Sequence, residues 1–400
     1  MSFLSKRLSR FQSSVTVQIS QKARDLETRG REIISLSSGE PDFNTPEDIK
    51  NGAIKAINNN FTKYTAVDGI IELKKAIKKK FLDENELNFE IDQITVGVGG
   101  KHVIYNLFMS TLNPDDEVII PAPYWVSYPD IVKLCGAKPI ILKTNIDSMF
   151  KISVNDLEKL ITKKTKWLVI NSPSNPTGVV YNDIDLKKIS EVLVKNKHVN
   201  ILSDDIYEHI IYGKNLFSNI LNLEPKLFKR VFIVNGVSKA FSMTGWRIGY
   251  GAGQTEVIKS IAKIQSQSTT NPTSISQMAA LSALKSDKKF LKTWISEFEK
   301  RRDFVFSEFN KIKGLRCMKP DGAFYMFTSC EKLLGRTTPE GKIINNDLDF
   351  SNFLLEYAGV AVVPGQAFGT SPFFRISYAA SMKLLEEACK KIGSAILLLK

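Results

Sequence analysis

The sequence contains few residues of the kinds that build disulfide frameworks, metal centres or membrane spans. Its four cysteines lie far apart and form no CxxC pair, which argues against a disulfide scaffold and against a zinc knuckle. The three histidines, His102, His198 and His209, show no metal-ligand spacing. No stretch approaches the roughly 18 uncharged apolar residues that a membrane helix requires. These features predict a reduced, cytoplasmic protein with neither a metal ion nor a membrane partner.

The composition is that of a folded globular protein. Apolar residues make up 43% and charged residues 24% of the 400 positions, a length that favours two or more lobes. The net charge is 55 − 42 = +13. The lysines are spread along the whole chain, whereas a nucleic-acid-binding protein usually gathers its basic residues on one element with a recognisable motif. We therefore interpret the charge as a solvated lysine-rich surface and expect no nucleic-acid partner.

The first 24 residues contain no acidic residue. They include Lys6, Arg7, Arg10 and Lys22, a pattern that a mitochondrial transit peptide would also have. The alternative is an arm of the mature protein that packs on another surface. Composition alone does not decide between them.

Between residues 94 and 253, short apolar runs alternate with segments of helical period such as Asp183–Lys195. The runs are rich in Val and Ile and lack polar alternation, as expected of strands that are covered on both faces. This pattern predicts an α/β fold with a mostly parallel sheet. The candidate strands are Ile94–Gly97, Glu117–Ile120, Lys138–Lys143, Trp167–Asn171, Val199–Ser203, Val231–Asn235 and Arg247–Gly251.

The chain changes character after about residue 290. A long charged helix over Leu291–Lys313 is followed by strands near Ala323–Phe327 and Val360–Val363 and by a helix that starts at Met382. We therefore predict a large domain over residues 45–290. A smaller α+β domain would combine residues 1–44 with residues 291–400.

Ligands in open α/β sheets collect beyond the carboxyl ends of the strands. Lys239 follows the strand Val231–Asn235, and Arg247 lies eight residues later. A lysine at a strand end can form a Schiff base when its surroundings lower the pKa of its amine, and an arginine nearby can hold a phosphate through two hydrogen bonds. The pair alone is also compatible with a solvated lysine, but the whole string Ser238–Tyr250 is far more specific.

Polar residues also follow two other predicted strands. Asp204 comes directly after Val199–Ser203, where a carboxylate is costly unless a positive group faces it. The protonated pyridine nitrogen of pyridoxal phosphate would be such a group, and a helix N-cap aspartate is the alternative. Asn175 lies in the proline-rich loop Ser172–Gly178, which can present its amide to a ligand or be an ordinary turn.

A glycine loop joins the strand Ile94–Gly97 to a predicted helix that ends near Leu112. Gly99 and Gly100 expose backbone N–H groups at the start of this helix, an arrangement suited to phosphate. A Walker A motif would require Gly at 95 and Ser or Thr at 102, and a GxGxxG fingerprint would require Gly at 102, so neither is present.

These motifs occur in an order that is similar to that of one enzyme family. The chain resembles a fold-type I, pyridoxal-phosphate-dependent class I aminotransferase of the bacterial aspartate aminotransferase subgroup, which includes aspartate/prephenate enzymes. The resemblance extends from Leu8 through Gly39–Phe43 and Lys63–Thr65 to Phe374–Tyr378. It implies a mostly parallel seven-stranded sheet between helices in a large, cofactor-binding domain, and a smaller α+β domain. It also favours an N-terminal arm over a transit peptide.

The resemblance implies a set of contacts to pyridoxal 5'-phosphate. Lys239 would form the Schiff base and later move the proton of the substrate α-carbon, which needs an amine that loses its proton near neutral pH. Asp204 would pair with the pyridine nitrogen. Tyr64 would reach the phosphate from a neighbouring subunit, which implies a homodimer with shared active sites. The other expected contacts are Trp125 stacked on the ring, Asn175 and Tyr207 at the ring oxygen, and Ser238, Arg247 and the amides of Gly100 and Lys101 at the phosphate.

The resemblance also implies a substrate site. Arg375 matches an arginine that grips the α-carboxylate, a two-pronged contact that a lysine does not offer. Lys101 resembles a lysine that binds the distal carboxylate of aspartate or glutamate, although a solvated lysine at a helix start is the alternative. The residues expected to assist are Gly39, Asn175 and Trp125, with Ser14 and Thr16 lining the same pocket.

The chain departs from the subgroup at two positions. Relatives with prephenate activity carry a basic residue where this chain has Gln12, which argues against prephenate as a substrate. Relatives commonly have Gln where this chain has His102, and we draw no consequence from that difference.

These observations favour amino-group transfer between L-aspartate and 2-oxoglutarate, giving oxaloacetate and L-glutamate in two half-reactions. An aspartate/glutamate–prephenate aminotransferase, an aromatic aminotransferase and, less favoured, a C–S lyase would use Arg375 and Asp204 equally well, but Lys101 favours a dicarboxylic substrate. A ligand-sensing domain of a transcription regulator would need a winged-helix segment before the enzyme-like part. The resemblance begins within the first ten residues and leaves no room for one.

Overall fold

A seven-stranded sheet forms the centre of the larger part of the protein. The computed structural model describes residues 3–11 and 15–400, with backbone only for helix residues 15–18 and 20. The strand order is β2-β8-β7-β6-β5-β3-β4, and only β8 runs antiparallel to its neighbours. This sheet confirms the predicted α/β fold class. Its strands are β2 (Ile94–Gly97), β3 (Glu117–Ala122), β4 (Lys138–Lys143), β5 (Thr165–Asn171), β6 (Asn200–Asp204), β7 (Val231–Gly236) and β8 (Gly249–Ala252).

Both faces of this sheet are covered by helices, which explains why its strands lack polar alternation. On β5, Leu168 and Ile170 belong to one apolar cluster, whereas Trp167 and Val169 belong to another on the opposite face. The first face is covered by α2 (Glu47–Asn58), α3 (Ile71–Asn85), α6 (Val154–Leu160), α7 (Asp183–Lys195), α8 (Ile220–Leu223) and α10 (Ser274–Lys285). The second face is covered by α4 (Gly100–Thr111), α5 (Ser127–Leu134) and α9 (Thr255–Ser266).

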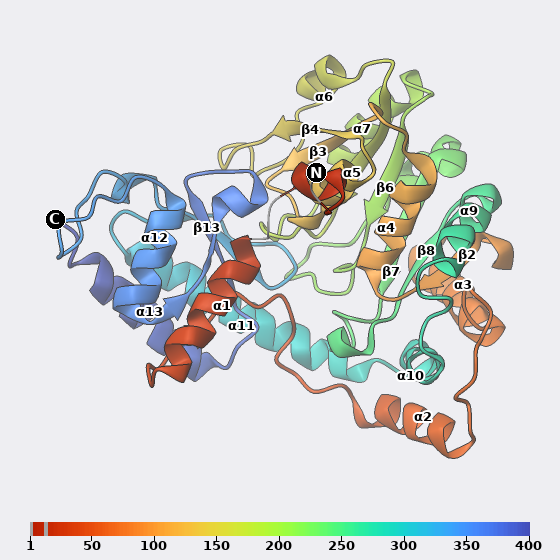
Figure 1. Ribbon diagram of the computed structural model, residues 1–400, viewed down its shortest axis with the longest axis horizontal. Helices are drawn as coiled ribbons and strands as arrows, with labels where there is room; N and C mark the ends of the chain where they lie inside the picture. The colour runs from red at the N-terminus through yellow and green to blue at the C-terminus, as the bar shows by residue number, and fades with distance from the viewer. Residues whose placement is uncertain (1–2, 12–14) are drawn as a thin grey trace.

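The C-terminal part has its own apolar cluster, built around a four-stranded antiparallel sheet of order β12-β13-β10-β9. The long helix α11 (Lys289–Lys311) runs from the region of α10 to this part of the molecule (Figure 1). The strands are β9 (Arg316–Cys317), β10 (Tyr325–Ser329), β12 (Val363–Pro364) and β13 (Phe373–Ser377), and the other helices there are α1 (Val15–Thr28), α12 (Asp347–Phe353) and α13 (Met382–Ile396).

Several predicted strands differ from the observed ones by one or two residues at an end, as at β10, which was expected near Ala323–Phe327. Two differ for a reason that the backbone shows. The strand expected over Arg247–Gly251 begins only at Gly249, because Arg247 has a φ of 57°, a left-handed conformation that ends the short helical turn η4 (Thr244–Trp246). The strand expected over Val360–Val363 is two strands. Its first half, β11 (Val360–Ala361), pairs in parallel with β1 (Ile34–Ser35), and its second half is β12. The chain thus passes from one sheet to another within four residues.

The N-terminal segment lies far from the helix that follows it. The turn Lys6–Arg10 packs on α5, where the guanidinium of Arg10 donates to the carbonyl of Leu134 at 3.2 Å, and Figure 1 shows this turn, in red, beside the helix. Within residues 3–11 and 15–400, no helix is both long enough and apolar enough to cross a bilayer.

The strand β8 passes in van der Waals contact with the glycine loop at the start of α4. A Cβ atom placed on Gly249 would lie 2.2 Å from the backbone nitrogen of Gly100 and 2.5 Å from the carbonyl carbon of Gly99. Backbone atoms of a helix start cannot rotate aside as a flexible side chain can. Only glycine at position 249 therefore allows this loop to lie where it does.

We expect Gly249→Ala to lower the free energy of unfolding by about 3 kcal/mol, because the added methyl group forces two backbone segments apart. Urea denaturation of the purified variant measures this change. Gly245→Ala is the matched control, since a Cβ there meets no described atom within 4 Å. We expect the control to change stability by less than about 0.5 kcal/mol. Equal losses in the two variants would show that the close approach at Gly249 is not the cause.

Candidate active site

The expected site residues whose side chains the structure describes line, with one exception, a single cavity of about 400 Å³ at the carboxyl ends of β5, β6 and β7. The exception is Tyr64. The cavity is therefore where the topology of an open α/β sheet places a ligand. The expected residues that line it are Gly39, Gly100, Lys101, Trp125, Asn175, Asp204, Tyr207, Ser238, Lys239, Arg247 and Arg375.

Lys239 lies three residues beyond β7 and extends its amine into the cavity. The Nζ atom donates a hydrogen bond to the carbonyl of Gly39 at 2.6 Å and lies 5.8 Å from the ring centre of Tyr207. Burial lowers the pKa of this amine to about 8, and the charges of Arg375 and Arg247 lower it further, against an opposing effect of Glu40. The amine is therefore far more readily deprotonated than an exposed lysine, as a nucleophile or proton carrier must be.

Asp204 is the last residue of β6 and is only 5% exposed. Its Oδ2 accepts a hydrogen bond of 2.5 Å from the hydroxyl of Tyr128, and its Oδ1 accepts one of 3.3 Å from the amide of Ile206. Burial raises the pKa of this carboxyl to about 6, although both hydrogen bonds and the charge of Lys239 act in the other direction. The carboxylate would gain most from a further positive group inside the cavity.

Arg375 reaches the cavity from β13, in the other sheet. Its guanidinium donates to Oδ1 of Asn175 at 3.0 Å and to the carbonyl of Ser37 at 2.7 Å. Its Nε is buried and has no hydrogen-bond partner among the described residues. A guanidinium that is held on two sides and left with a free donor is prepared to bind a carboxylate.

Arg247 also lines the cavity and lies against the glycine loop. Its Nη1 donates to the carbonyl of Thr244 at 2.8 Å, and its Nη2 donates to that of Val98 at 3.4 Å. The left-handed backbone of Arg247 is costly for a residue with a Cβ and indicates a positional requirement. Nearby, Nδ1 of His102 accepts a hydrogen bond of 3.2 Å from the amide of Val98, so His102 supports the same loop.

Lys101 follows directly in α4. Its ammonium lies 5.0 Å from the ring centre of Trp125, on the face of the indole. Partial burial and the charge of Arg247 lower the pKa of Lys101. Three cationic side chains thus line the cavity, namely Lys101, Arg247 and Arg375.

Tyr64 lies between α2 and α3 and is 87% exposed, outside the cavity. Its expected contact, with a phosphate bound in another subunit, stays a prediction. Gln12, Ser14 and the side chain of Thr16 lie outside the described part of the structure.

Two tyrosines that line this cavity, Tyr128 and Tyr325, were not predicted from the sequence. Tyr128 donates to Asp204, and it could have been suspected because it follows Trp125 by three residues, one helical turn away. Tyr325 shares a hydrogen bond of 2.7 Å with the hydroxyl of Tyr207, and its ring lies 4.6 Å from the guanidinium of Arg375. Tyr325 stands on β10, in a stretch without a distinguishing motif, so no local signal identifies it.

Known proteins resemble this chain over its whole length. A sequence profile of the family described as "Aminotransferase class I and II" matches residues 31–392. The protein of Rickettsia conorii named "Probable aspartate/prephenate aminotransferase" is 54% identical over 396 residues, which are 99% of each chain. The "Aspartate/prephenate aminotransferase" of Cereibacter sphaeroides is 50% identical over 98% of each chain.

A solved structure agrees with these relatives. The crystal structure of the aspartate aminotransferase of Rhizobium meliloti superimposes with a TM-score of 0.97 at 48% sequence identity, and the match covers 100% of both chains. The fold and the cavity are those of an α/β enzyme of the transferase type, with a buried lysine of lowered pKa three residues beyond a strand. The chain belongs to the class I and II aminotransferase family. The family resemblance predicted from the motifs is confirmed.

We expect the amine of Lys239 to titrate near pH 8, well below the usual value of 10.5. Glu40→Gln should lower this midpoint, because the variant loses a nearby negative charge. Arg375→Met should raise it, because that variant loses a nearby positive charge. The ¹³Cε shift of lysine-labelled protein without ligand reports the titration, with Lys239→Ala identifying the signal. A midpoint near 10.5 that neither variant moves would show that burial and these two charges do not set the pKa of Lys239.

Proposed function

We propose that this protein transfers the amino group of L-aspartate to 2-oxoglutarate, giving oxaloacetate and L-glutamate. The observation that carries the proposal is the cavity itself, in which Lys239 lies together with Arg375 and Lys101, two cations suited to the two carboxylates of one substrate. Relatives that are about 50% identical and are named for aspartate support it.

We further propose pyridoxal 5'-phosphate as the cofactor, because the residues present fit it. The amides of Gly100 and Lys101, Ser238 and Arg247 would form a donor set for a phosphate. The amide of Gly99, expected to be free, instead donates to the carbonyl of Gly97 at 2.8 Å. A Cβ on Gly99 would meet Arg247 at 2.4 Å, so the loop and the guanidinium are closely fitted. The buried carboxylate of Asp204 suits a cationic ring nitrogen. When bound, this cofactor withdraws electrons from the bonds at the substrate α-carbon.

The chain's own residues would then perform three tasks. Arg375 would bind the α-carboxylate and orient the substrate, with Asn175 and Gly39 beside it. Lys239 would take the α-proton and return it, because its amine is neutral in an appreciable fraction of molecules near neutral pH. Trp125 would cover one side of the cavity and keep water from the reacting atoms.

An aspartate/prephenate activity is the second candidate. The names of relatives that are 50 to 54% identical favour it. The cavity also has an apolar wall that would accept a ring, formed by Ile104, Val126 and Phe368. Gln12, which argues against prephenate, lies outside the described residues, so prephenate belongs among the substrates to be tested.

We also propose that the enzyme works as a homodimer with shared active sites. Tyr64 supports this because its 87% exposed side chain is available to another subunit. Large apolar side chains on the neighbouring helices are also about half exposed, namely Ile54, Ile57 and Ile71.

The domain division and the location of the protein also stay proposals. Residues 45–290 would form one domain of the chain, and residues 1–44 with 291–400 would form the other. Four free cysteines support a reducing, cytoplasmic location.

The first experiment screens amino donors with 2-oxoglutarate and oxaloacetate as acceptors, for the wild type and for Lys101→Met. We expect oxaloacetate from aspartate. The variant should lose about 10- to 100-fold in kcat/KM for aspartate, the cost of one charge-assisted hydrogen bond, while keeping its activity with apolar amino acids. Prephenate and phenylpyruvate are added as further acceptors.

Failure to form oxaloacetate, together with turnover of aromatic amino acids, would overturn the aspartate proposal in favour of an aromatic aminotransferase. An equal loss with all substrates in Lys101→Met would remove the distal-carboxylate role from Lys101. If pyridoxal phosphate produces no visible absorption band in the wild type, or if the band persists in Lys239→Ala, the cofactor proposal is wrong.

The shared site predicts that two defective variants rescue each other. In a mixed dimer of Tyr64→Ala and Lys239→Ala subunits, one site combines the intact Lys239 of one chain with the intact Tyr64 of the other. Random mixing should restore about a quarter of the intact sites. Activity and light scattering of the co-refolded mixture measure this. A monomer in solution, or a mixture no more active than the sum of its parts, would contradict the proposal.

A further inference from the structure

A buried ion pair lies directly behind the turn that carries Asp204 and Tyr207. The ammonium of Lys80, on α3, contacts Oε1 of Glu208, and the two side chains are 1% and 4% exposed. The Oε2 of Glu208 also accepts a hydrogen bond of 2.7 Å from the amide of Asn85, at the end of α3. Its Oε1 accepts another of 2.6 Å from Asn235, on β7. One carboxylate is thus held by two different elements.

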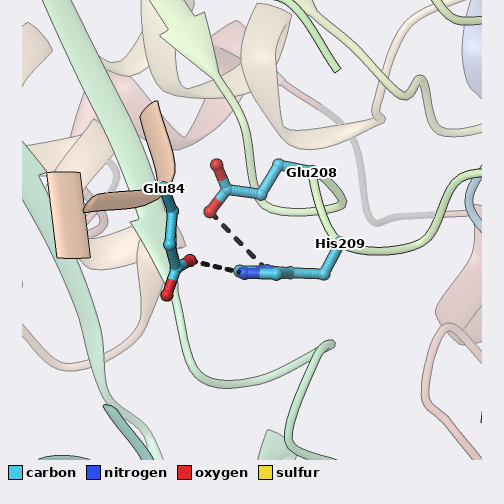
Figure 2. A group of neighbouring side chains, drawn as sticks. All are labelled: Glu84, Glu208 and His209. Atoms are coloured by element: carbon cyan, nitrogen blue, oxygen red, sulfur yellow. Dashed lines mark hydrogen bonds and ion pairs between the residues drawn. The ribbon is translucent and has the colours of Figure 1, made fainter. Parts of the chain in front are cut away.

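The network continues outward through His209 and Glu84 (Figure 2). Nε2 of His209 lies 2.8 Å from Oε2 of Glu84, and Nδ1 lies 3.6 Å from Oε1 of Glu208. The ligand atoms of these three residues lie within 4.8 Å of one another, a spacing that a metal ion could bridge. However, the ammonium of Lys80 contacts Glu208 and that of Lys288 contacts Glu84. These two ammonium groups already balance the negative charges of the two carboxylates, so we assign no metal to this group.

The turn between β6 and this network is short and internally bonded. The amide of Glu208 donates to the carbonyl of Asp205 at 2.9 Å, and the amide of Ile210 donates to that of Tyr207 at 2.8 Å. Asp204 and Tyr207 line the cavity, whereas Glu208 does not and contacts α3 and β7 instead. Glu208 therefore connects the turn that carries the two cavity residues to α3 and β7.

Stability alone does not explain such a pair. Two charges removed from water lose hydration, and well-packed apolar residues in their place are often equally stable or more stable. Burial by itself would raise the pKa of Glu208, but the charge of Lys80 and the hydrogen bonds from Lys80 and Asn85 lower it, so the carboxylate stays ionised. The ionised carboxylate is held in a fixed position by several hydrogen bonds. An apolar side chain could not make these bonds.

We propose that Glu208, held by Lys80, is a positioning residue that fixes the turn on which Asp204 and Tyr207 stand. This inference rests on the proposed function only for the roles of those two residues toward the cofactor. The position of the turn itself is a property of the protein without ligand. The geometry is the reason to single out Glu208: it is the residue that follows Tyr207, and its carboxylate joins the turn to α3 and β7.

The test compares Glu208→Gln with Lys74→Met. Lys74 is a matched control because it stands on the same helix, its side chain is 7% exposed, and its ammonium lies 2.5 Å from Oδ2 of Asp68, away from the turn. We expect amide hydrogen exchange of residues 204–210 to be about 10-fold faster or more in Glu208→Gln, as the loss of one buried hydrogen bond to a charged group implies. The control should leave this exchange unchanged even where it lowers the melting temperature.

In the cofactor-loaded protein, Glu208→Gln should bind pyridoxal phosphate more weakly. It should also lose kcat on the order of 100-fold with a smaller change in KM, because displaced groups no longer meet the reacting atoms. If Glu208→Gln does not fold, the double variant Lys80→Met with Glu208→Gln removes both charges together and serves in its place. Faster exchange of residues 204–210 in that variant supports the proposal, and unchanged exchange overturns it.

The proposal is overturned if a folded Glu208 variant keeps wild-type exchange in residues 204–210 and wild-type cofactor affinity. It is also overturned if Lys74→Met accelerates this exchange to the same extent. The two proposals fail separately. If the wild type does not bind pyridoxal phosphate, the proposed function is wrong, while exchange in the cofactor-free protein still decides whether Glu208 fixes the turn.

Discussion

The burial of one carboxylate, that of Asp204 at the end of β6, is the constraint on which the rest of the site depends. Asp204 is almost fully buried, and the hydrogen bonds from Tyr128 and Ile206 do not offset the lost hydration, since the pKa of the carboxyl remains raised to about 6. Desolvation of this kind favours the neutral acid unless a cation enters the site. The cavity is therefore electrostatically incomplete as the chain folds, and the group that completes it is expected to carry a positive charge.

Burial in the same cavity lowers the pKa of Lys239, whereas it raises that of Asp204. Burial lowers the pKa of the amine to about 8, and the guanidinium groups of Arg375 and Arg247 add to the effect. The acid and the amine both lie in one cavity, and both are shifted toward their neutral forms. Pairs of titratable groups whose surroundings shift them in this way are typical of sites that exchange protons at neutral pH. Burial in one cavity thus makes the amine of Lys239 easier to deprotonate and makes the carboxylate of Asp204 more costly to leave without a cation.

Much of the candidate site could be predicted because it lies next to strand ends. Asn175, Asp204 and Lys239 each follow a Val- and Ile-rich run, and the carboxyl ends of parallel strands meet at one edge of a sheet. The glycine loop could be predicted for a similar reason, since it precedes a helix. The fold class followed from the same runs, whose lack of polar alternation matches a sheet covered on both faces.

The residues that could not be predicted depend on contacts between segments distant in sequence. Glu208 and Lys80 are 128 positions apart. The residues next to each of them in the sequence do not indicate whether the two charges form a buried ion pair or lie separately on the surface. Tyr325 and Tyr207 are 118 positions apart, and their shared hydrogen bond depends on how β10 lies against the end of β6. The left-handed backbone at Arg247 also had no signal, because the residues around it read as the start of a strand.

Arg375 links segments from three sheets at the cavity. It stands on β13, yet it donates to Asn175, which follows β5, and to the carbonyl of Ser37, which follows β1. Its buried Nε finds no acceptor among the described residues, and a buried donor without a partner costs about 1–3 kcal/mol. The contacts of the guanidinium nevertheless hold the loop after β5 and the segment after β1 against β13. One side chain therefore fixes three segments of the cavity wall relative to one another.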